Sequence, residues 1–441
     1  MPALVDELID WLRIPSVSSG GGDADAIRAA GQWVVDRIAA AGGSAELVET
    51  DGNPLAVGEL RASTDPESAP TILIYGHYDV QGVGPLELWE SGPFDADMRD
   101  GKVYARGAVD DKGNFLPLLH VAADMARAGE LPVNVRVLAE GEEEVGSREV
   151  MRWIARDERG ADAAIVFDSG MLDARTPAIT VAVRGMVAVA IDVRVASADL
   201  HSGLYGGAVL NAVHVLHEVL SVVLPGPDGV LREELQEGVA SPSPEELAGW
   251  RSLPDAAAAI AESGGRPLGP HAVADFYART WAGPSIDVNG IEGGEAEQER
   301  TIVPATARAK LSMRLAPGQE YSEMAPVLER LLREAVPEGA DVDIRMHGSD
   351  PALFDPTLPA IQLGSDAIER ATGVKPALVR SGGSIPILAA FAERRIPTIL
   401  SGFMLPEDAL HAPNESFGLD RLEMGARSAR ELYLALAAMR A

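Results

Sequence analysis

Short apolar runs alternate with helical segments in the N-terminal part of the chain, and this alternation limits the fold more than any other feature. The runs "TILIYG" (71–76), "VNVRVLA" (133–139) and "AAIVF" (163–167) are typical of buried strands, since they are short and bounded by polar or turn residues. Helical patterns occupy 113–129 and 147–160. Strands that alternate with helices predict a sheet with parallel strands, covered by helices on both faces.

The pattern changes in the middle of the chain and returns toward its end. Alternating apolar and polar residues at 186–196 and 306–319 predict antiparallel strands with one covered face. We therefore expect an α/β domain with a mixed, mostly parallel sheet, formed by residues 1–183 and 349–441. An α+β domain at 184–348 is expected to interrupt it.

Composition excludes several function classes. The chain holds 67 Asp and Glu against 37 Lys and Arg, a net charge of −30, which argues against binding to nucleic acid or to an anionic membrane surface. The absence of cysteine excludes disulfides, thiolate metal sites and thiol nucleophiles. The N-terminal segment is amphipathic and acidic, unlike a signal peptide, and no apolar run reaches membrane-spanning length. We expect a cytoplasmic protein.

Polar residues follow four of the predicted strands. His77 follows the first strand, the acidic stretch "EGEEEVGS" (140–147) follows the second, and Asp168 follows the third. His411 lies a short loop beyond a strand near the C-terminus. In open α/β sheets, ligands bind outside the carboxyl ends of the strands. Four such ends on one edge favour a shared site over four unrelated helix caps.

The residue types at this edge suit a metal centre. Asp110 and Asp111 precede a helix between the first two strands, which adds carboxylates to two imidazoles, with no thiolate. Mixed nitrogen and oxygen donors suit Zn²⁺, and also Co²⁺ or Mn²⁺. A pair of ions about 3.5–4 Å apart needs a bridging carboxylate, terminal ligands and a free acid as base. The residues alone do not say which glutamate of 140–147 does what, and a solvated acidic turn is the alternative for that stretch.

Five motifs carry a resemblance to a known family. In order along the chain they are "GHYDVQ" (76–81), "ARGAVDDKGN" (105–114), "EGEEEVGS" (140–147), "DLHSGLYGG" (199–207) and "RSGGSIP" (380–386). Over nearly its whole length the chain resembles the M20 family of metallopeptidases, and within it the carnosinase-like cytosolic dipeptidases. The resemblance implies an enzyme that hydrolyses dipeptides or short peptides with a free C-terminal carboxylate.

The same resemblance implies two divalent metal ions per subunit, with zinc as the first expectation and manganese or cobalt as alternatives. His77 and His411 would be terminal ligands of different ions, and Asp110 would bridge the two. Glu144 and Asp168 would complete the ligand set.

Three further features of this site are implied. Glu143 would be the general base that takes a proton from the metal-activated water and hands it to the leaving amine. Asp79 would orient His77 through the second ring nitrogen. The peptide bond between Asp110 and Asp111 would be cis.

The inserted domain supplies the substrate contacts that the resemblance implies. His201 would reach the partner subunit's active site in a homodimer and stabilise the oxyanion, with closure of the insert over the substrate. Arg314 would clamp the substrate carboxylate with its guanidinium fork. Outside the insert, "SGGSIP" places Gly383 and Ser384 at a predicted helix N-terminus, which would seat the same carboxylate through free backbone N–H groups. Thr301 and His347 match more weakly, as further substrate contacts.

The sequence leaves the substrate specificity open. Ser381 stands where close members of the family tend to have an acid, which affects the expected substrate pocket. An amidohydrolase that acts on N-acyl amino acids or N-succinyl diamines would use the same metals with a different pocket. A non-catalytic binding protein on the same scaffold, and a metal-storage or sensing protein, are more remote alternatives.

Overall fold

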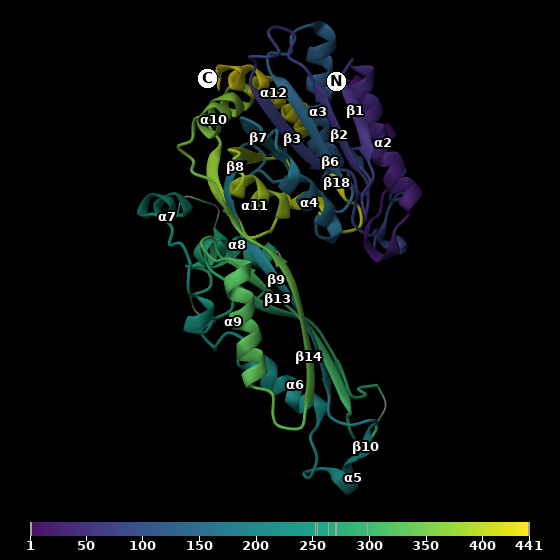
Figure 1. Cartoon of the computed structure of the whole chain (residues 1–441), viewed down its shortest axis with the longest axis vertical. Helices are drawn as coiled ribbons and strands as arrows, with labels where there is room; N and C mark the ends of the chain where they lie inside the picture. The colour runs from purple at the N-terminus through teal and green to yellow at the C-terminus, as the bar shows by residue number, and fades with distance from the viewer. Residues whose placement is uncertain are drawn as a thin grey trace. The chain divides into compact units, whose positions relative to one another are not determined.

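The structure is a computed structural model that describes residues 2–439, apart from residues 252, 254, 263, 270 and 298. The chain divides into two compact units. The major unit comprises Met1–Val181, Phe354–Val379 and Pro386–Ala441, and the inserted unit comprises Ala182–Leu353 and Arg380–Ile385. Figure 1 shows the elements of both.

A nine-stranded sheet forms the centre of the major unit, counted over the described residues. Its order is β1-β2-β6-β3-β7-β17-β8-β15, with β16 beside β8. The four central strands β6 (Asn134–Glu140), β3 (Thr71–His77), β7 (Ala163–Phe167) and β17 (Thr398–Ser401) run parallel. The flanking strands are β1 (Ser44–Val48), β2 (Leu55–Leu60), β8 (Ala178–Val183), β15 (Ala352–Leu353) and β16 (Ala377–Ser381). The predicted mixed, mostly parallel sheet is confirmed.

Helices cover both faces of this sheet. The crossovers β3–α3–β6 and β6–α4–β7 run in opposite directions along the sheet, so their right-handed sense places α3 and α4 on opposite faces. On one side α3 packs against α1 and α12, and α12 packs against α10; on the other, α4 packs against α11. The helices are α1 (Pro2–Leu12), α2 (Ala24–Ala40), α3 (Lys112–Ala128), α4 (Arg148–Arg156), α10 (Pro359–Thr372), α11 (Pro386–Glu393) and α12 (Leu419–Leu436).

Burial of the central strands explains their sequence. All seven residues of β6 and all five of β7 are buried, because helices cover both sides, and such strands are apolar almost throughout. Three polar residues of β6 are also buried: Asn134, Arg136 and Glu140. Arg136 lies at 4 % exposure and donates two hydrogen bonds to Asp157, at 2.8 and 2.9 Å. A small sheet of β4 (Asp97–Arg99), β5 (Lys102–Tyr104) and β18 (Ser416–Gly418) completes the major unit.

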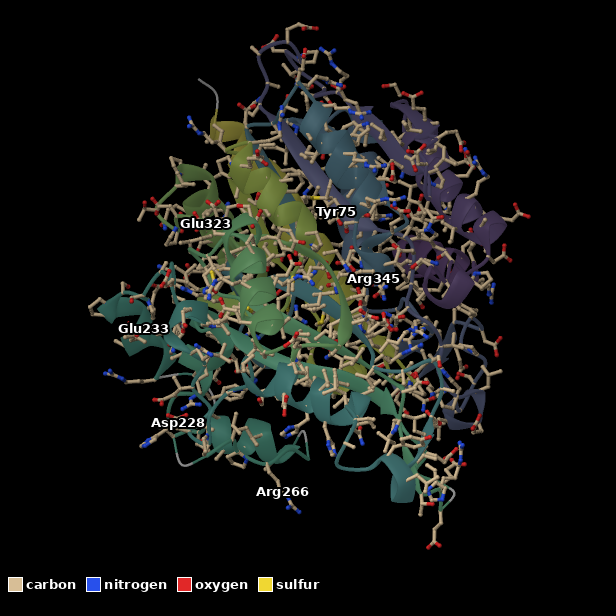
Figure 2. The ribbon with its side chains drawn as sticks, turned by 60° about the horizontal axis from the view of Figure 1, so that its bottom comes forward. Tyr75, Asp228, Glu233, Arg266, Glu323 and Arg345 are labelled. Atoms are coloured by element: carbon tan, nitrogen blue, oxygen red, sulfur yellow. The ribbon has the colours of Figure 1, made fainter. Side chains whose placement is uncertain are left out.

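The inserted unit contains a four-stranded antiparallel sheet in the order β11-β13-β9-β14. Buried and half-buried residues alternate along β9 (Gly185–Arg194), because α6 (Ala212–Ser221) and α9 (Tyr321–Glu334) pack on one face only. The open face carries charged side chains such as Arg345, whose Nη2 lies 2.5 Å from Asp192 Oδ2 (Figure 2). The other strands are β11 (Ser285–Gly293), β13 (Thr306–Leu315) and β14 (Asp341–Ser349).

Short helices fill the chain between α6 and β11, and a small ladder lies apart from the main sheet. The ladder pairs β10 (Leu200–His201) with β12 (Ile302–Val303). The helices between α6 and β11 include α7 (Pro244–Trp250), α8 (Ala256–Glu262) and a π-helical turn (Ala278–Ala282), whereas the short helix α5 (Ser202–Tyr205) directly follows β10. Among the described residues, no helix combines the length and apolar character needed to cross a membrane.

The C-terminal helix α12 allows a matched test of the core. Leu432 is fully buried among the helices of the major unit, whereas Leu434 in the same helix is 45 % exposed. We expect Leu432→Ala to lower the free energy of unfolding by about 2–5 kcal/mol, because it leaves a cavity. Leu434→Ala should change it by no more than about 0.5 kcal/mol. Urea denaturation followed by circular dichroism measures both, and equal losses would contradict the packing described.

Candidate metal centre

The carboxyl ends of neighbouring parallel strands bring the predicted ligands together. His77 is the last residue of β3, and Asp168 directly follows β7. Glu144 lies in a short 3₁₀ turn (Glu143–Val145) after β6, and Asp110 lies two residues before α3. His411 comes from the loop that follows β17.

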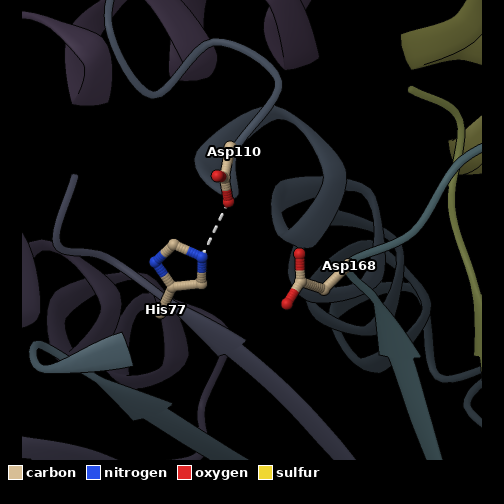
Figure 3. Close-up of side chains that lie close together, drawn as sticks. All are labelled: His77, Asp110 and Asp168. Atoms are coloured by element: carbon tan, nitrogen blue, oxygen red, sulfur yellow. Dashed lines mark hydrogen bonds and ion pairs between the residues drawn. The ribbon is translucent and has the colours of Figure 1, made fainter. Parts of the chain in front are cut away.

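These five residues form two groups that share one member. One donor atom from each of His77, Asp110 and Asp168 lies within 4.8 Å of the others (Figure 3). The same holds for Asp110, Glu144 and His411. Asp110 Oδ1 lies 2.9 Å from His77 Nε2, and Asp110 Oδ2 lies 2.8 Å from His411 Nε2. One carboxylate thus faces two imidazoles with its two oxygens, the arrangement that a bridging ligand requires.

The buried acids of the cluster carry perturbed pKa values, which favour the binding of cations. Burial raises the pKa of Asp168 to about 7, with repulsion from Asp110 as the next cause. Burial also raises the pKa of Glu143 well above its ordinary value. Although burial opposes the change, hydrogen bonds from His411 and His77 lower the pKa of Asp110. Several buried carboxylates therefore share two imidazoles, and buried charge of this kind is usually paired or bound to metal.

An unpartnered oxygen at Glu144 supports the same conclusion. Glu144 Oε2 lies 3.2 Å from both His411 Nε2 and Gln81 Nε2. Its Oε1 is buried without a hydrogen-bond partner among the described residues, which is costly for a carboxylate. A divalent ion bound by Glu144 would satisfy that oxygen. The residues fit two divalent ions, and their nitrogen and oxygen donors suit Zn²⁺, Mn²⁺ or Co²⁺.

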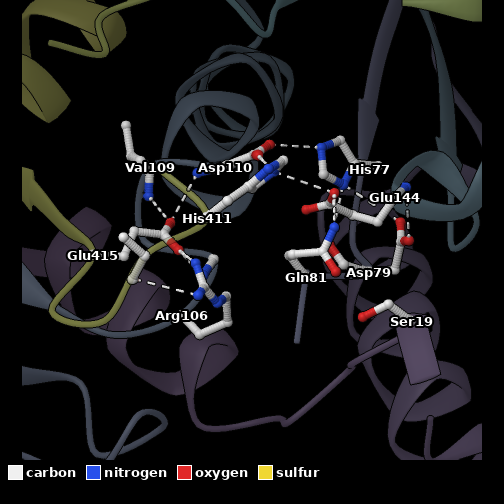
Figure 4. Close-up of polar contacts among 12 residues, drawn as sticks. Ser19, His77, Asp79, Gln81, Arg106, Val109, Asp110, Glu144, His411 and Glu415 are labelled. Carbon is white, nitrogen blue, oxygen red and sulfur yellow. Dashed lines mark hydrogen bonds and ion pairs between the residues drawn. The ribbon is translucent and has the colours of Figure 1, made fainter. Parts of the chain in front are cut away.

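Asp79 lies outside both ligand groups and holds His77 and the glutamate turn in position (Figure 4). It is fully buried, and His77 Nδ1 lies 3.0 Å from its carbonyl oxygen and 3.4 Å from Oδ1. This directs Nε2 of the ring toward Asp110. The side chain of Asp79 also accepts hydrogen bonds from the backbone N–H groups of Glu143 and Glu144, at 3.3 and 3.2 Å, and from the Ser18 hydroxyl at 2.6 Å. A single carboxylate therefore ties the histidine to the glutamate turn.

The other two glutamates of the acidic stretch point away from the shared ligands. Glu142 accepts hydrogen bonds from the backbone N–H groups of Asn53 at 3.0 Å and Glu149 at 3.2 Å, so it anchors the turn to its neighbours. Glu140 is fully buried and accepts a hydrogen bond of 2.5 Å from the Tyr75 hydroxyl. Burial raises the pKa of Glu140 to about 8.

Sequence reasoning missed a buried pair that supports Asp110. Glu415 accepts hydrogen bonds from the backbone N–H groups of Gly107, Val109 and Asp110, at 3.1, 2.9 and 3.2 Å. Arg106 Nη1 donates to the same carboxylate at 2.6 Å, and both side chains are almost fully buried (Figure 4). Arg106 lies inside the motif "ARGAVDDKGN", but nothing in the sequence joins it to a glutamate 309 residues away.

A second ion pair that sequence reasoning missed holds the loop of His411. Arg421 of α12 donates from Nη1 to the carbonyl of Phe403 at 2.9 Å and from Nη2 to Asp408 Oδ1 at 2.6 Å. Asp408 is fully buried and lies in that loop. His411 itself has φ +58°, a left-handed backbone conformation. The expected cis peptide bond between Asp110 and Asp111 is present.

The predicted carboxylate-binding residues lie together within the inserted unit. Arg314 Nη1 donates to Ser384 Oγ at 2.9 Å. The backbone N–H of Arg184 donates to the carbonyl of Gly383 at 3.1 Å, and the N–H of Gly383 donates to Ser381 Oγ at 3.1 Å. The expected helix begins later than predicted: α11 starts at Pro386, so Ser384 lies two residues before it.

The remaining predicted contacts also belong to the inserted unit. The carbonyl of Thr301 accepts from the N–H of Ser202 at 2.9 Å, next to the exposed His201, whose Nδ1 accepts from the N–H of Gly203 at 3.0 Å. His347 and Arg314 both lie on the open face of the sheet, in neighbouring cross-strand rows.

Comparison with known proteins identifies the family. The chain matches Peptidase family M20/M25/M40 over residues 73–435, and it belongs to this family. The resemblance to the M20 family and to its carnosinase-like dipeptidases is thereby confirmed.

Similar proteins cover most of the chain. It is 28% identical over 397 residues to the Cys-Gly metallodipeptidase dug1 of Schizosaccharomyces pombe, covering 84% of this chain and 80% of that protein. It is 28% identical over 383 residues to the human Beta-Ala-His dipeptidase, covering 82% and 73%. The crystal structure of the M20 family metallo-carboxypeptidase Sso-CP2 from Sulfolobus solfataricus superimposes with a TM-score of 0.90 at 26% identity, covering 99% of this chain and 100% of that one.

The role of Asp79 can be tested without measuring turnover. Asp79→Asn removes the negative charge beside His77 and replaces one acceptor of the glutamate turn. We expect the affinity of the metal-stripped protein for Zn²⁺ to fall about 10–100-fold, measured by isothermal titration calorimetry. Asp51→Asn is the matched control, since Asp51 is exposed and pairs only loosely with Arg152. Equal affinities for the two variants would refute the role.

Proposed function

We propose that the chain is a di-metal dipeptidase that cleaves dipeptides or short peptides with a free C-terminal carboxylate. The observation that carries the proposal is the sharing of Asp110 between two groups of possible metal ligands. Similarity to a Cys-Gly metallodipeptidase and a Beta-Ala-His dipeptidase supports the substrate class.

The ligands divide between two ions in this proposal. His77 and Asp168 would hold one ion, His411 and Glu144 would hold the other, and Asp110 would serve both. Divalent ions held there would polarise the scissile carbonyl and lower the pKa of the attacking water. Zn²⁺ is the first choice for this donor set, with Mn²⁺ and Co²⁺ as alternatives.

Glu143 acts as the general base. It adjoins the ligand Glu144 but belongs to neither group of ligands, so its carboxylate stays free to accept a proton. Its backbone N–H donates to Asp79, which limits the movement of the turn that carries it. The carboxylate takes a proton from water and delivers it to the leaving amine.

Residues of the inserted unit bind the substrate. Arg314 and Ser384 form a hydrogen-bonded pair that presents donors to a carboxylate, with the N–H groups of the loop at Gly383 as further candidates. His201 stabilises the oxyanion in the active site of the partner subunit of a homodimer. Thr301, which adjoins it, and His347, on the face that carries Arg314, contribute further substrate contacts. Residues 184–348 act as a lid and dimerisation domain.

A mixed substrate panel tests the activity. The protein is stripped with a chelator, given Zn²⁺, Mn²⁺ or Co²⁺, and offered dipeptides and N-acyl amino acids. We expect no turnover without metal and restored cleavage of dipeptides with at least one ion, because the two groups of possible metal ligands share Asp110. Cleavage of acyl substrates alone would assign the chain to the amidohydrolases. A lack of metal-dependent turnover on both sets would favour a non-catalytic binding protein.

The base is tested by a single substitution. Glu143→Gln keeps the size of the side chain but removes its ability to accept a proton. We expect turnover to fall about 10²–10⁴-fold, while the protein still binds two metal ions by elemental mass spectrometry. Glu130→Gln, at an exposed glutamate of the same unit, should leave both quantities unchanged. Near-normal turnover by the Glu143 variant would disprove the assignment.

A further inference from the structure

A buried arginine, to which the proposed mechanism gives no role, directly precedes the loop "SGGS" (381–384). Arg380 lies at the end of β16 with 4 % of its surface exposed, directly before Ser381. Its Nε and Nη2 both donate to Glu246 Oε1, at 2.9 and 2.7 Å. Glu246 belongs to α7, 134 residues earlier in the chain. The pair therefore joins the segment between α6 and β11 to the strand that enters the loop.

Glu246 is itself held in place. Its Oε2 accepts from the backbone N–H of Ser243 at 2.8 Å, and its own N–H donates to Ser243 Oγ at 3.1 Å. This reciprocal capping box fixes the first turn of α7. One carboxylate thus caps the helix with one oxygen and binds Arg380 with the other, so the position of Arg380 depends on a rigid partner.

Aromatic side chains enclose the arginine on another side. The Arg380 guanidinium lies 5.6 Å from the centroid of the Trp250 ring, within the range of a cation–π contact. Trp250 packs edge-on against Trp281, with 5.6 Å between the ring centroids. Trp281 lies in the π-helical turn, so two parts of the segment between α6 and β11 converge on this position.

The π-helical turn also packs directly against the loop at Gly382. A Cβ at Gly382 would lie 2.8 Å from the carbonyl oxygen of Thr280, closer than such contacts normally allow, so the two backbones are in close contact. From the other side, Arg184 Nε donates to the Gly382 carbonyl at 3.0 Å, and its Nη1 reaches Ser285 Oγ at 3.2 Å. The loop is therefore held between Arg184, which directly precedes β9, and the π-helical turn.

We propose that Arg380 and Glu246 are positioning residues that set the geometry of the Gly382–Ser384 loop and thereby the enzyme's preference for substrates with a free C-terminal carboxylate. The inference rests on the proposed function, in which Arg314 and Ser384 bind that carboxylate. Loss of the ion pair frees the strand end before Ser381 and misplaces Ser384 relative to Arg314. Substrate binding weakens, whereas the metal centre and the chemical step are unaffected.

The test compares a dipeptide with its C-terminal amide on the full-length, metal-loaded enzyme. The wild type should bind the acid more tightly than the amide. In Glu246→Ala, we expect KM for the acid to rise about tenfold, the effect of one lost charged hydrogen bond, with kcat within about threefold. KM for the amide should not change, because the amide does not use the carboxylate seat. Glu334→Ala, which breaks the exposed pair with Arg330 in α9, is the matched control and should leave all values unchanged.

A conservative variant guards against a simple loss of folding. Glu246→Gln keeps the shape of the side chain and one neutral acceptor oxygen, which can serve Arg380 while the amide NH2 replaces the acceptor of the Ser243 N–H. It should therefore fold and show a KM for the acid between those of wild type and Glu246→Ala. The unfolding temperatures of the wild type, Glu246→Ala and Glu246→Gln measure separately how much the ion pair contributes to stability.

Three outcomes would overturn the inference. If Glu246→Ala raised KM equally for acid and amide, the Arg380–Glu246 pair would be a general structural contact. If KM rose for neither substrate, the pair would have no role in substrate binding. A wild type that does not distinguish acid from amide would remove the carboxylate seat on which the inference rests, while metal-dependent cleavage would still stand. Absence of all dipeptide cleavage by the wild type would be a failure of the proposed function.

Discussion

The carboxylate of Asp110 is the interaction on which the site depends. Its two oxygens lie 2.9 and 2.8 Å from the Nε2 atoms of His77 and His411, which come from opposite ends of the sequence. Each imidazole belongs to a separate group of ligands, and only Asp110 belongs to both. Because several acids are buried around it, the cluster needs compensating positive charge, which two divalent ions would supply.

A layer of buried acids behind the ligands holds them in position. Asp79 binds His77 and the glutamate turn, and Glu415 accepts three N–H groups around Asp110. Asp408 takes the same role for the loop of His411, through Arg421. In each case a carboxylate accepts charged or backbone donors away from water, where such hydrogen bonds are strong and a lost partner is costly. The predicted ligands are thus positioned by residues outside the two ligand groups.

Much of the fold could be predicted because local patterns decide it. "AAIVF" coincides with β7, and the alternation around 186–196 appears as the one-sided burial of β9. The convergence of strand ends followed from parallel pairing alone. By contrast, the hairpin of β1 and β2 at the edge of the sheet was not predicted, and α11 begins at Pro386, two residues after Ser384, where a helix N-terminus was expected. The pairs of Glu415 with Arg106 and of Glu246 with Arg380 join distant segments, and no periodicity marks them.

By itself, the sequence determined the fold class, the family and the set of acids and histidines that meet at one edge of the sheet. These properties rest on periodicity and on motifs, which are local. Only the tertiary structure decided which oxygen of Asp110 faces which histidine, which acids support the ligands, and that Arg380 is clamped beside the loop of Ser384. The physical reason is that hydrogen bonds and burial depend on distances between atoms, and chain folding sets those distances between residues that the sequence keeps far apart.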